Sequence, residues 1–198
     1  MCSAGCLPRK ELFEAWEVAR RVRRRFRGGR VVDLCAGHGL LGQIMLLLDD
    51  SSPEVLIIDR ALSPSTSTIA QVITTAWPKL KGRVTFCEME LADVDLREDD
   101  VVVSIHACGA LTDHVIDLAV TARSRLAVLP CCHDLDTAQT GALTGWFDGP
   151  LAIDVVRATK LRALGWQVWT QTIPPEITPH NRLLIAEPPD SVRTAHRR

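Results

Sequence analysis

The chain has 198 residues, 46% of them hydrophobic, so it can bury one full core but is too short for two ordinary domains. A formal net charge of -1 excludes a global positive field that would draw the protein onto nucleic acid, and no recognition of DNA sequence is expected. No apolar stretch reaches the length of a signal peptide or a membrane span, and the seven cysteines lack the spacing of a disulfide scaffold. These features predict a cytoplasmic protein with reduced cysteines and no membrane association.

The first predicted element is an amphipathic basic helix over residues 9–27. Its apolar side chains recur three and four residues apart, at Leu12, Ala15, Ala19, Val22 and Phe26. Glutamates in its first turns and arginines in its last turns suit the helix dipole, and Gly28 and Gly29 end it. We expect residues 1–29 to pack on a domain of residues 30–187, with residues 188–198 as a flexible tail.

From residue 30 onward, short apolar runs alternate with helical stretches. The predicted strands are residues 30–35, 54–59, 83–87, 101–105, 125–129, 166–173 and 182–187, and the predicted helices are residues 40–48, 66–77, 111–123 and 151–164. Strands that are apolar on both faces favour a mostly parallel sheet covered by helices on both sides. Because only residues 174–181 join the last two strands, these should pair antiparallel. The predicted fold class is therefore α/β and Rossmann-like, with a mostly parallel seven-stranded sheet ending in a C-terminal antiparallel hairpin.

A glycine-rich turn follows the first strand, in the segment VVDLCAGHGLLG. Gly37, Gly39 and Gly42 form a GxGxxG pattern between a strand and a helix, where small residues let the backbone approach a cofactor. Asp59 closes the second strand, where a carboxylate can accept hydrogen bonds from ribose hydroxyls. The pattern by itself fits a nicotinamide dinucleotide nearly as well as S-adenosylmethionine.

Asp33 favours the second cofactor. A carboxylate just before the turn would repel a pyrophosphate but suits a sulfonium and an ammonium group. The alternative is that Asp33 only hydrogen-bonds loop amides, as buried carboxylates commonly do. Glu88 and Glu90 follow the third strand, and Glu90 is our choice for the adenine amino group, the alternative being a solvated loop carboxylate. The predicted cofactor set is completed by Ala36, Arg60, Leu91 and His106.

Histidines and cysteines follow the fourth and fifth strands, whose carboxyl ends should lie side by side facing the cofactor. They are His106, Cys108, Cys131, Cys132 and His133. We predict that His106 and Cys108 are the catalytic residues bordering the methyl group, with His106 as proton acceptor or orienting group. The alternative is that His106 packs against the cofactor and hydrogen-bonds a neighbour. All five side chains are potential zinc ligands, but adjacent residues should not all point one way and no CxxC pair is present, so no metal site is expected.

These two segments also carry a resemblance to a known family. HACGALTD and CCHD resemble the HxCGxxTD and CCHH segments of a methyltransferase family that includes eukaryotic acceptor-stem tRNA ribose 2'-O-methyltransferases. The closing PHNRLLIA is similar to segments of methyltransferase-like proteins fused to a glutathione S-transferase C-terminal domain. The resemblance runs from Val31 to Glu187 and implies a class I S-adenosylmethionine-dependent methyltransferase. Two departures bear on the tRNA substrate and not on the cofactor: Asp134 replaces a second histidine, and the zinc-finger region of the tRNA enzymes is absent.

An arginine-rich run offers a candidate RNA contact. It consists of Arg20, Arg21, Arg23, Arg24, Arg25, Arg27 and Arg30. Forked guanidinium donors bind phosphates, although a solvated helix end that balances the dipole is the alternative. The sequence thus predicts a methyltransferase whose acceptor is RNA, with a protein or a small molecule as alternative acceptors. The alternatives to methyl transfer are a nicotinamide-dependent oxidoreductase and a catalytically silent cofactor-binding subunit.

Overall fold

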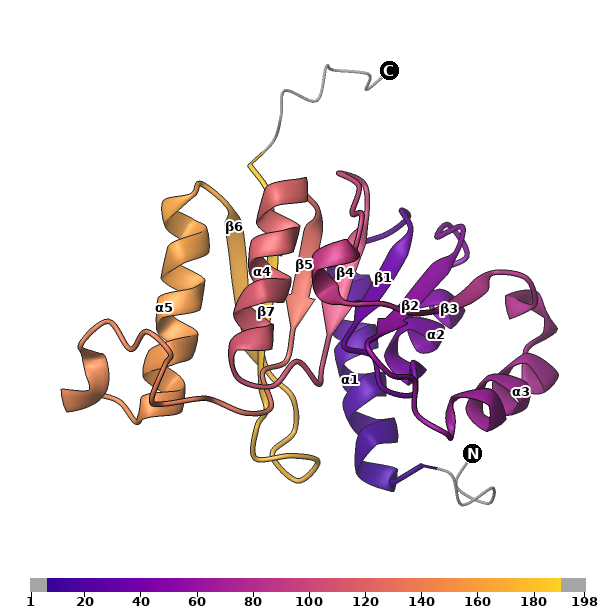
Figure 1. Cartoon of the computed structure of the whole chain (residues 1–198), viewed down its shortest axis with the longest axis horizontal. Helices are drawn as coiled ribbons and strands as arrows, with labels where there is room; N and C mark the ends of the chain where they lie inside the picture. Colours follow the sequence, from indigo (N-terminus) through magenta and orange to yellow (C-terminus); the bar gives the residue numbers. More distant parts are fainter. Residues whose placement is uncertain (1–6, 190–198) are drawn as a thin grey trace.

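The computed structural model describes residues 7–189, which form one seven-stranded sheet with helices on both faces (Figure 1). The strands are β1 (Val31–Leu34), β2 (Val55–Asp59), β3 (Val84–Glu88), β4 (Val101–Ser104), β5 (Arg125–Val128), β6 (Gln167–Thr172) and β7 (Arg182–Glu187). Their order across the sheet is β3-β2-β1-β4-β5-β7-β6. The order reverses between β1 and β4, and in an α/β sheet such a reversal opens a crevice at the carboxyl ends of the strands.

Within residues 7–189, five helices cover the sheet. They are α1 (Arg9–Arg25), α2 (Leu40–Leu47), α3 (Thr66–Ala76), α4 (Ala110–Ala122) and α5 (Gly149–Ala163), with short 3-10 turns at η2 (Pro78–Leu80), η3 (Leu91–Asp93) and η4 (Leu143–Gly145). Alternate side chains of each central strand enter two cores. Val31 and Val103 join a core with α1, α2 and α3, whereas Val32 and Val102 join a core with α4 and α5. The central strands β1 and β4 are therefore buried on both faces, which explains their continuous apolar runs.

The predicted fold class is confirmed, including the antiparallel hairpin. β7 pairs antiparallel with both β5 and β6, and the other neighbouring pairs are parallel. Several elements are shorter than predicted because the backbone leaves regular geometry early. Cys35 has a left-handed φ of 53° that ends β1, and Phe26 is extended with φ -112° and ψ 123°, which ends α1 at Arg25.

Helix α1 packs on α2, and its buried residues belong to the same core as the sheet. Residues 1–6 and 190–198 of the predicted terminal segments lie outside the described residues. Among residues 7–189, no helix has both the length and the apolar character needed to cross a membrane.

A buried ion pair joins the starts of β1 and β4. The Nε and Nη2 atoms of Arg30 donate to the two carboxylate oxygens of Asp100 at 2.9 and 2.7 Å. Asp100 is fully buried and also accepts the backbone N–H of Arg97 at 2.7 Å. The pair therefore holds the start of β1 against the start of β4, and the carboxylate of Asp100 keeps hydrogen-bond partners for both oxygens.

Replacing Asp100 tests this account. Asp100→Ala leaves the buried guanidinium of Arg30 without its partner, so the free energy of unfolding should fall by about 3–5 kcal/mol in urea denaturation. The matched control is Asp50→Ala, which removes an exposed pair with Lys79 and should leave the urea midpoint nearly unchanged. Equal midpoint shifts in the two variants would contradict this explanation.

Candidate functional site

The turn between β1 and α2 is built from left-handed backbone. The φ angle is 53° at Cys35, 56° at Gly37 and 71° at Gly39. Gly39 has no room for a side chain, because a Cβ would lie 2.5 Å from Cγ2 of Ile57. A Cβ on Gly37 would meet no atom within 4 Å, since that side of the turn is open. The turn therefore presents bare backbone at the carboxyl edge of the sheet.

Two aspartates hold this backbone in place. Asp33 Oδ2 accepts the N–H of Gly42 at 2.8 Å, inside the first turns of α2. Asp59 Oδ2 accepts the N–H of Gly37 at 2.8 Å, and its Oδ1 accepts the N–H of Ala61 at 3.2 Å. The second oxygen of Asp33 is buried and has no hydrogen-bond partner among the described residues. The hydrogen bond from Asp33 to a backbone amide, which the sequence offered as an alternative, is thus present. The contact of Asp33 with a cofactor stays a prediction.

Burial controls the charge of Asp33, which is 1% exposed. Desolvation raises the pKa of Asp33 to about 8; the Gly42 amide works against this shift and the charge of Asp59 adds to it. At neutral pH the carboxyl group therefore keeps its proton in the unliganded protein. A cation bound nearby would favour the ionised form.

A cavity of about 420 Å³ opens beside the turn, at the carboxyl ends of the strands. The predicted residues that line it are Gly37, Asp59, Arg60, Glu90, Leu91 and His106. Ala36 and Gly39 do not line it, because Ala36 bonds to the backbone of Ile58 and Gly39 packs on Ile57. Asp33 does not line the cavity either, because its side chain lies beneath the turn and bonds to Gly42 in α2.

The choice of Glu90 over Glu88, the last residue of β3, fits the geometry. Glu88 Oε1 accepts the backbone N–H of Leu62 at 3.1 Å and is not among the residues that line the cavity. Glu90 does line it, immediately before the η3 turn. Its contact with adenine remains a prediction.

His106 meets the requirements of a proton acceptor. Its Nε2 atom is buried and has no hydrogen-bond partner among the described residues, and the residue lines the cavity. Desolvation lowers the pKa of His106 below its ordinary 6.5, against the opposing charges of Glu11 and Glu14. The imidazole is therefore neutral at physiological pH, with a ring nitrogen free to accept a proton.

Glu11 and His38 line the same cavity and were not predicted as site residues. Glu11 Oε2 lies 2.5 Å from Nε2 of His38, and the rings of His38 and His106 pack edge to face with centroids 6.3 Å apart. His38 Nδ1 accepts the N–H of Leu40 at 3.3 Å, so its Nε2 carries the hydrogen that is donated to Glu11. In the sequence, the position of His38 inside the glycine pattern was the signal that could have found it; Glu11 looked like an ordinary helix-dipole residue.

Cys108 does not line the cavity. Its Sγ lies 3.1 Å from Sγ of Cys131, and together with Cys132 the three sulfur atoms lie within 4.8 Å of one another. Burial raises the pKa of Cys108 and, more strongly, that of Cys131, where the hydrogen bond to Cys108 adds to the effect. Both are therefore neutral thiols, which are poor nucleophiles, and Cys108 lies against Cys131 rather than in the lining of the cavity.

His133 points away from these cysteines. Its Nε2 lies 2.8 Å from Oδ1 of Asp154 on α5, and Asp154 Oδ2 accepts Nε of Arg182 at 2.6 Å. The hydrogen bonds from His133 and Arg182 lower the pKa of Asp154, overcoming the effect of its burial. The five potential ligands predicted to lie near one another are thus divided among three places.

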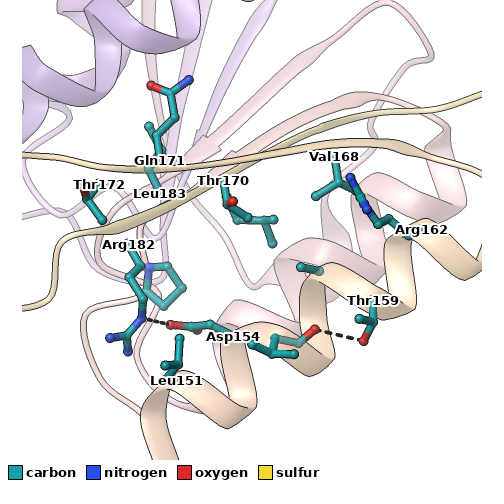
Figure 2. Close-up of a pocket in the computed structure, with 14 residues that line it drawn as sticks. Leu151, Asp154, Thr159, Arg162, Val168, Thr170, Gln171, Thr172, Arg182 and Leu183 are labelled. Atoms are coloured by element: carbon teal, nitrogen blue, oxygen red, sulfur yellow. Dashed lines mark hydrogen bonds and ion pairs between the residues drawn. The ribbon is translucent and has the colours of Figure 1, made fainter. Parts of the chain in front are cut away.

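A second cavity, of about 690 Å³, lies between α5 and the β6-β7 hairpin (Figure 2). Asp154 and Arg182 border one end of it, whereas the rest of its lining is mostly apolar. Although this cavity is larger, it contains none of the glycine-turn residues. The smaller cavity has both the bare backbone and the converging polar groups that a ligand site needs.

The arginine run is only partly available to a ligand. Arg23 is 2% exposed and pairs with Asp49 at 3.1 Å, and Arg30 is paired with Asp100. The exposed members are Arg24, Arg25 and Arg27. Arg25 follows Glu11 by fourteen residues in one helix, which places it about 21 Å along the axis from the cavity. Arg23 and Arg30 therefore cannot contact RNA phosphates, and the RNA contact itself stays a prediction.

Comparison with known proteins identifies the family. A family model described as a methyltransferase domain matches residues 11–138. The chain belongs to this methyltransferase domain family. The matched region begins at Glu11 and includes the glycine turn, His106 and all three clustered cysteines.

Individual relatives are distant. A glutathione S-transferase C-terminal domain-containing protein from Xenopus laevis is 29% identical over 110 residues, which is 54% of this chain and 16% of that protein. The chain thus spans about a sixth of the length of the curated relative. An O-methyltransferase family protein from Burkholderia thailandensis has a TM-score of 0.55 at 23% identity, covering 92% of this chain and 55% of the other. Magnesium protoporphyrin IX methyltransferase from Synechocystis PCC 6803, solved with bound SAH, has a TM-score of 0.53 at 17% identity, covering 90% of this chain and 83% of the other.

These structures establish the fold, and the family match establishes the kind of domain. S-adenosylmethionine is therefore the cofactor expected for this chain, as the sequence indicated.

Asp33→Asn tests the electrostatics of the turn. The pKa of Asp33 rises from an ordinary 3.8 to about 8 on folding, so its contribution to stability is full below pH 3.8 and is lost as pH rises to 8. Asparagine cannot ionise, and its carbonyl oxygen can still accept the Gly42 N–H. The thermal midpoint of the variant minus that of the native chain should grow from near zero at pH 4 to a maximum near pH 8. A difference that does not change with pH would contradict burial as the cause.

Proposed function

We propose that this chain transfers the methyl group of S-adenosylmethionine to an acceptor, with the cofactor bound in the 420 Å³ cavity beside the glycine turn. One observation carries the proposal: the charged groups lining the cavity are three carboxylates, from Glu11, Asp59 and Glu90, and one guanidinium, from Arg60. This excess of negative charge attracts a sulfonium and an ammonium group and repels a pyrophosphate. The same balance disfavours a nicotinamide dinucleotide.

The residues take roles that follow from their atoms. Asp59 offers carboxylate oxygens to ribose hydroxyls, and Glu90 accepts from the adenine amino group. Methyl transfer from a sulfonium is an in-line displacement, so the protein has mainly to align the acceptor and receive its proton. The unpaired Nε2 of His106 is the proton acceptor.

For the acceptor we propose RNA, and for the location the cytoplasm. The RNA proposal is supported by the resemblance of HACGALTD and CCHD to segments of tRNA ribose methyltransferases, and by the exposed Arg24, Arg25 and Arg27. The cytoplasmic proposal is supported by the free cysteines at positions 35, 87, 108, 131 and 132.

The first test measures ligand binding and then the acceptor. S-adenosylhomocysteine should raise the thermal midpoint of the purified chain, because a ligand stabilises the fold that binds it, whereas NAD should not. Incubation with methyl-labelled S-adenosylmethionine and separate RNA, protein and small-molecule fractions should then place the label in RNA. Stabilisation by NAD alone would contradict the cofactor. Label in protein or in metabolites would contradict the RNA acceptor, and cofactor binding without any label transfer would indicate a silent subunit.

The second test concerns His106. His106→Gln should lower kcat by about 10²–10⁴-fold, the usual effect of losing a general base, while the affinity for S-adenosylhomocysteine is retained. Because burial lowers the pKa of His106, kcat of the native chain should stay constant as pH falls to below 6.5 and should decrease only at lower pH. This decrease at low pH should be absent from the variant. His114→Gln, on the exposed side of α4, is the control and should leave kcat unchanged. Equal rates in both variants would exclude His106 as the base.

A further inference from the structure

Three cysteine side chains converge where β4 and β5 end. These strands are parallel neighbours, so the segments that follow them leave the same edge of the sheet (Figure 1). Cys108 comes from the segment after β4, and Cys131 and Cys132 come from the segment after β5. Their three Sγ atoms lie within 4.8 Å of one another, with 3.1 Å between those of Cys108 and Cys131.

The backbone fixes this arrangement. The N–H of Gly109 donates to the carbonyl oxygen of Cys132 at 3.3 Å, which joins the two segments directly beside the thiols. After β5 the chain leaves regular strand geometry, so the strict alternation of side chains that holds within a strand does not apply to Cys131 and Cys132. Cys131 and Cys132 therefore both approach Cys108, whereas the next residue, His133, points away to Asp154, as expected for adjacent residues that do not all point one way.

We propose that Cys108, Cys131 and Cys132 form a binding site for a thiophilic divalent metal ion, with Zn²⁺ as the physiological occupant. Zinc–thiolate bonds of about 2.3 Å in a tetrahedron place sulfur atoms about 3.8 Å apart. The Sγ atoms of Cys108 and Cys131 are closer than this, at 3.1 Å, and all three sulfur atoms lie within 4.8 Å of one another, so small side-chain adjustments reach that value. Each thiol releases one proton to solvent when it binds the ion, and water fills the fourth position.

Access and neighbours favour this set of ligands. Cys108 and Cys132 are exposed, so an ion can enter from solvent. His133 is not part of this compact group of sulfur atoms, and its Nε2 is bonded to Asp154.

The group formed by Glu11, His38 and His106 is equally compact but is less suited to a metal. The Leu40 amide already uses the Nδ1 lone pair of His38, and His38 bound through Nε2 would need its hydrogen on Nδ1.

The proposed metal would stabilise one wall of the cofactor cavity. Cys108 follows His106 by two residues, so an ion that ties Cys108 to the β5 segment also restrains the backbone that carries His106. Metal binding at the site can be measured without the cofactor, the acceptor or methyl transfer.

The experiment uses the full chain, reduced and treated with a chelator, and titrates it with Zn²⁺ in competition with a chromophoric chelator. We expect one zinc ion per chain and a rise in the thermal midpoint on binding. Titration with Co²⁺ should give a thiolate-to-cobalt charge-transfer band, which ligation by histidine and carboxylate would not give. A reduced chain that takes up no zinc, or a cobalt complex without that band, would overturn the proposal.

Variants assign the ligands. Cys131→Ser and Cys132→Ser should each abolish stoichiometric zinc binding and the cobalt band, and the second removes an exposed thiol, so its folding should be unaffected. Cys87→Ser makes the same sulfur-to-oxygen change on β3, and His38→Gln removes a potential ligand of the other group; both should bind zinc as the native chain does. Zinc binding retained by Cys131→Ser and Cys132→Ser would refute the site. Binding of S-adenosylhomocysteine is measured on the same samples: cofactor bound without zinc overturns the metal site alone, and zinc bound without cofactor overturns the proposed function alone.

Discussion

Two carboxylate-to-amide hydrogen bonds hold the β1–α2 turn, and the cofactor cavity depends on them. Asp33 binds the amide of Gly42 from below, and Asp59 binds the amide of Gly37 from the neighbouring strand. A turn that is left-handed at alternate residues has few internal hydrogen bonds of its own, so these side chains supplement them. The burial of Asp33 opposes its ionisation and leaves one oxygen unpaired, a cost that is typical of functional sites rather than of structural ones.

Charge, rather than volume, distinguishes the two cavities. The larger one, beside α5 and the β6-β7 hairpin, is bordered by a compensated network in which Asp154 accepts hydrogen bonds from Arg182 and His133. The smaller one carries three carboxylates against one guanidinium, and an imidazole whose pKa is lowered by burial. Only the smaller cavity lies where the sheet order reverses between β1 and β4, which is where α/β sheets bind their ligands. A cationic nucleoside therefore has one well-matched position in the described part of the chain.

The histidines and cysteines that follow β4 and β5 were predicted to lie together, but they occupy three different places. His106 faces the cofactor cavity, the three cysteines form a cluster beside it, and His133 joins the network of α5. Each of these positions follows from the partner that packs against it: the Glu11–His38 pair for His106, the opposite turn for the cysteines and Asp154 for His133. The arginine run is divided in the same way, because the buried carboxylates of Asp49 and Asp100 take Arg23 and Arg30 out of solvent.

The sequence by itself determined the strand and helix pattern, the antiparallel hairpin and the glycine turn. These depend on local periodicity, on a connection too short for a helix and on backbone angles that glycine adopts readily, all of which can be read within a few neighbouring residues. The tertiary structure alone decided that Glu11 reaches His38 and that Cys131 and Cys132 both approach Cys108. It also decided that Asp33 lies behind the cavity wall and that His133 turns away. These outcomes depend on packing between segments far apart in the chain, where the direction of one side chain is set by the volume and charge of another that no local pattern specifies.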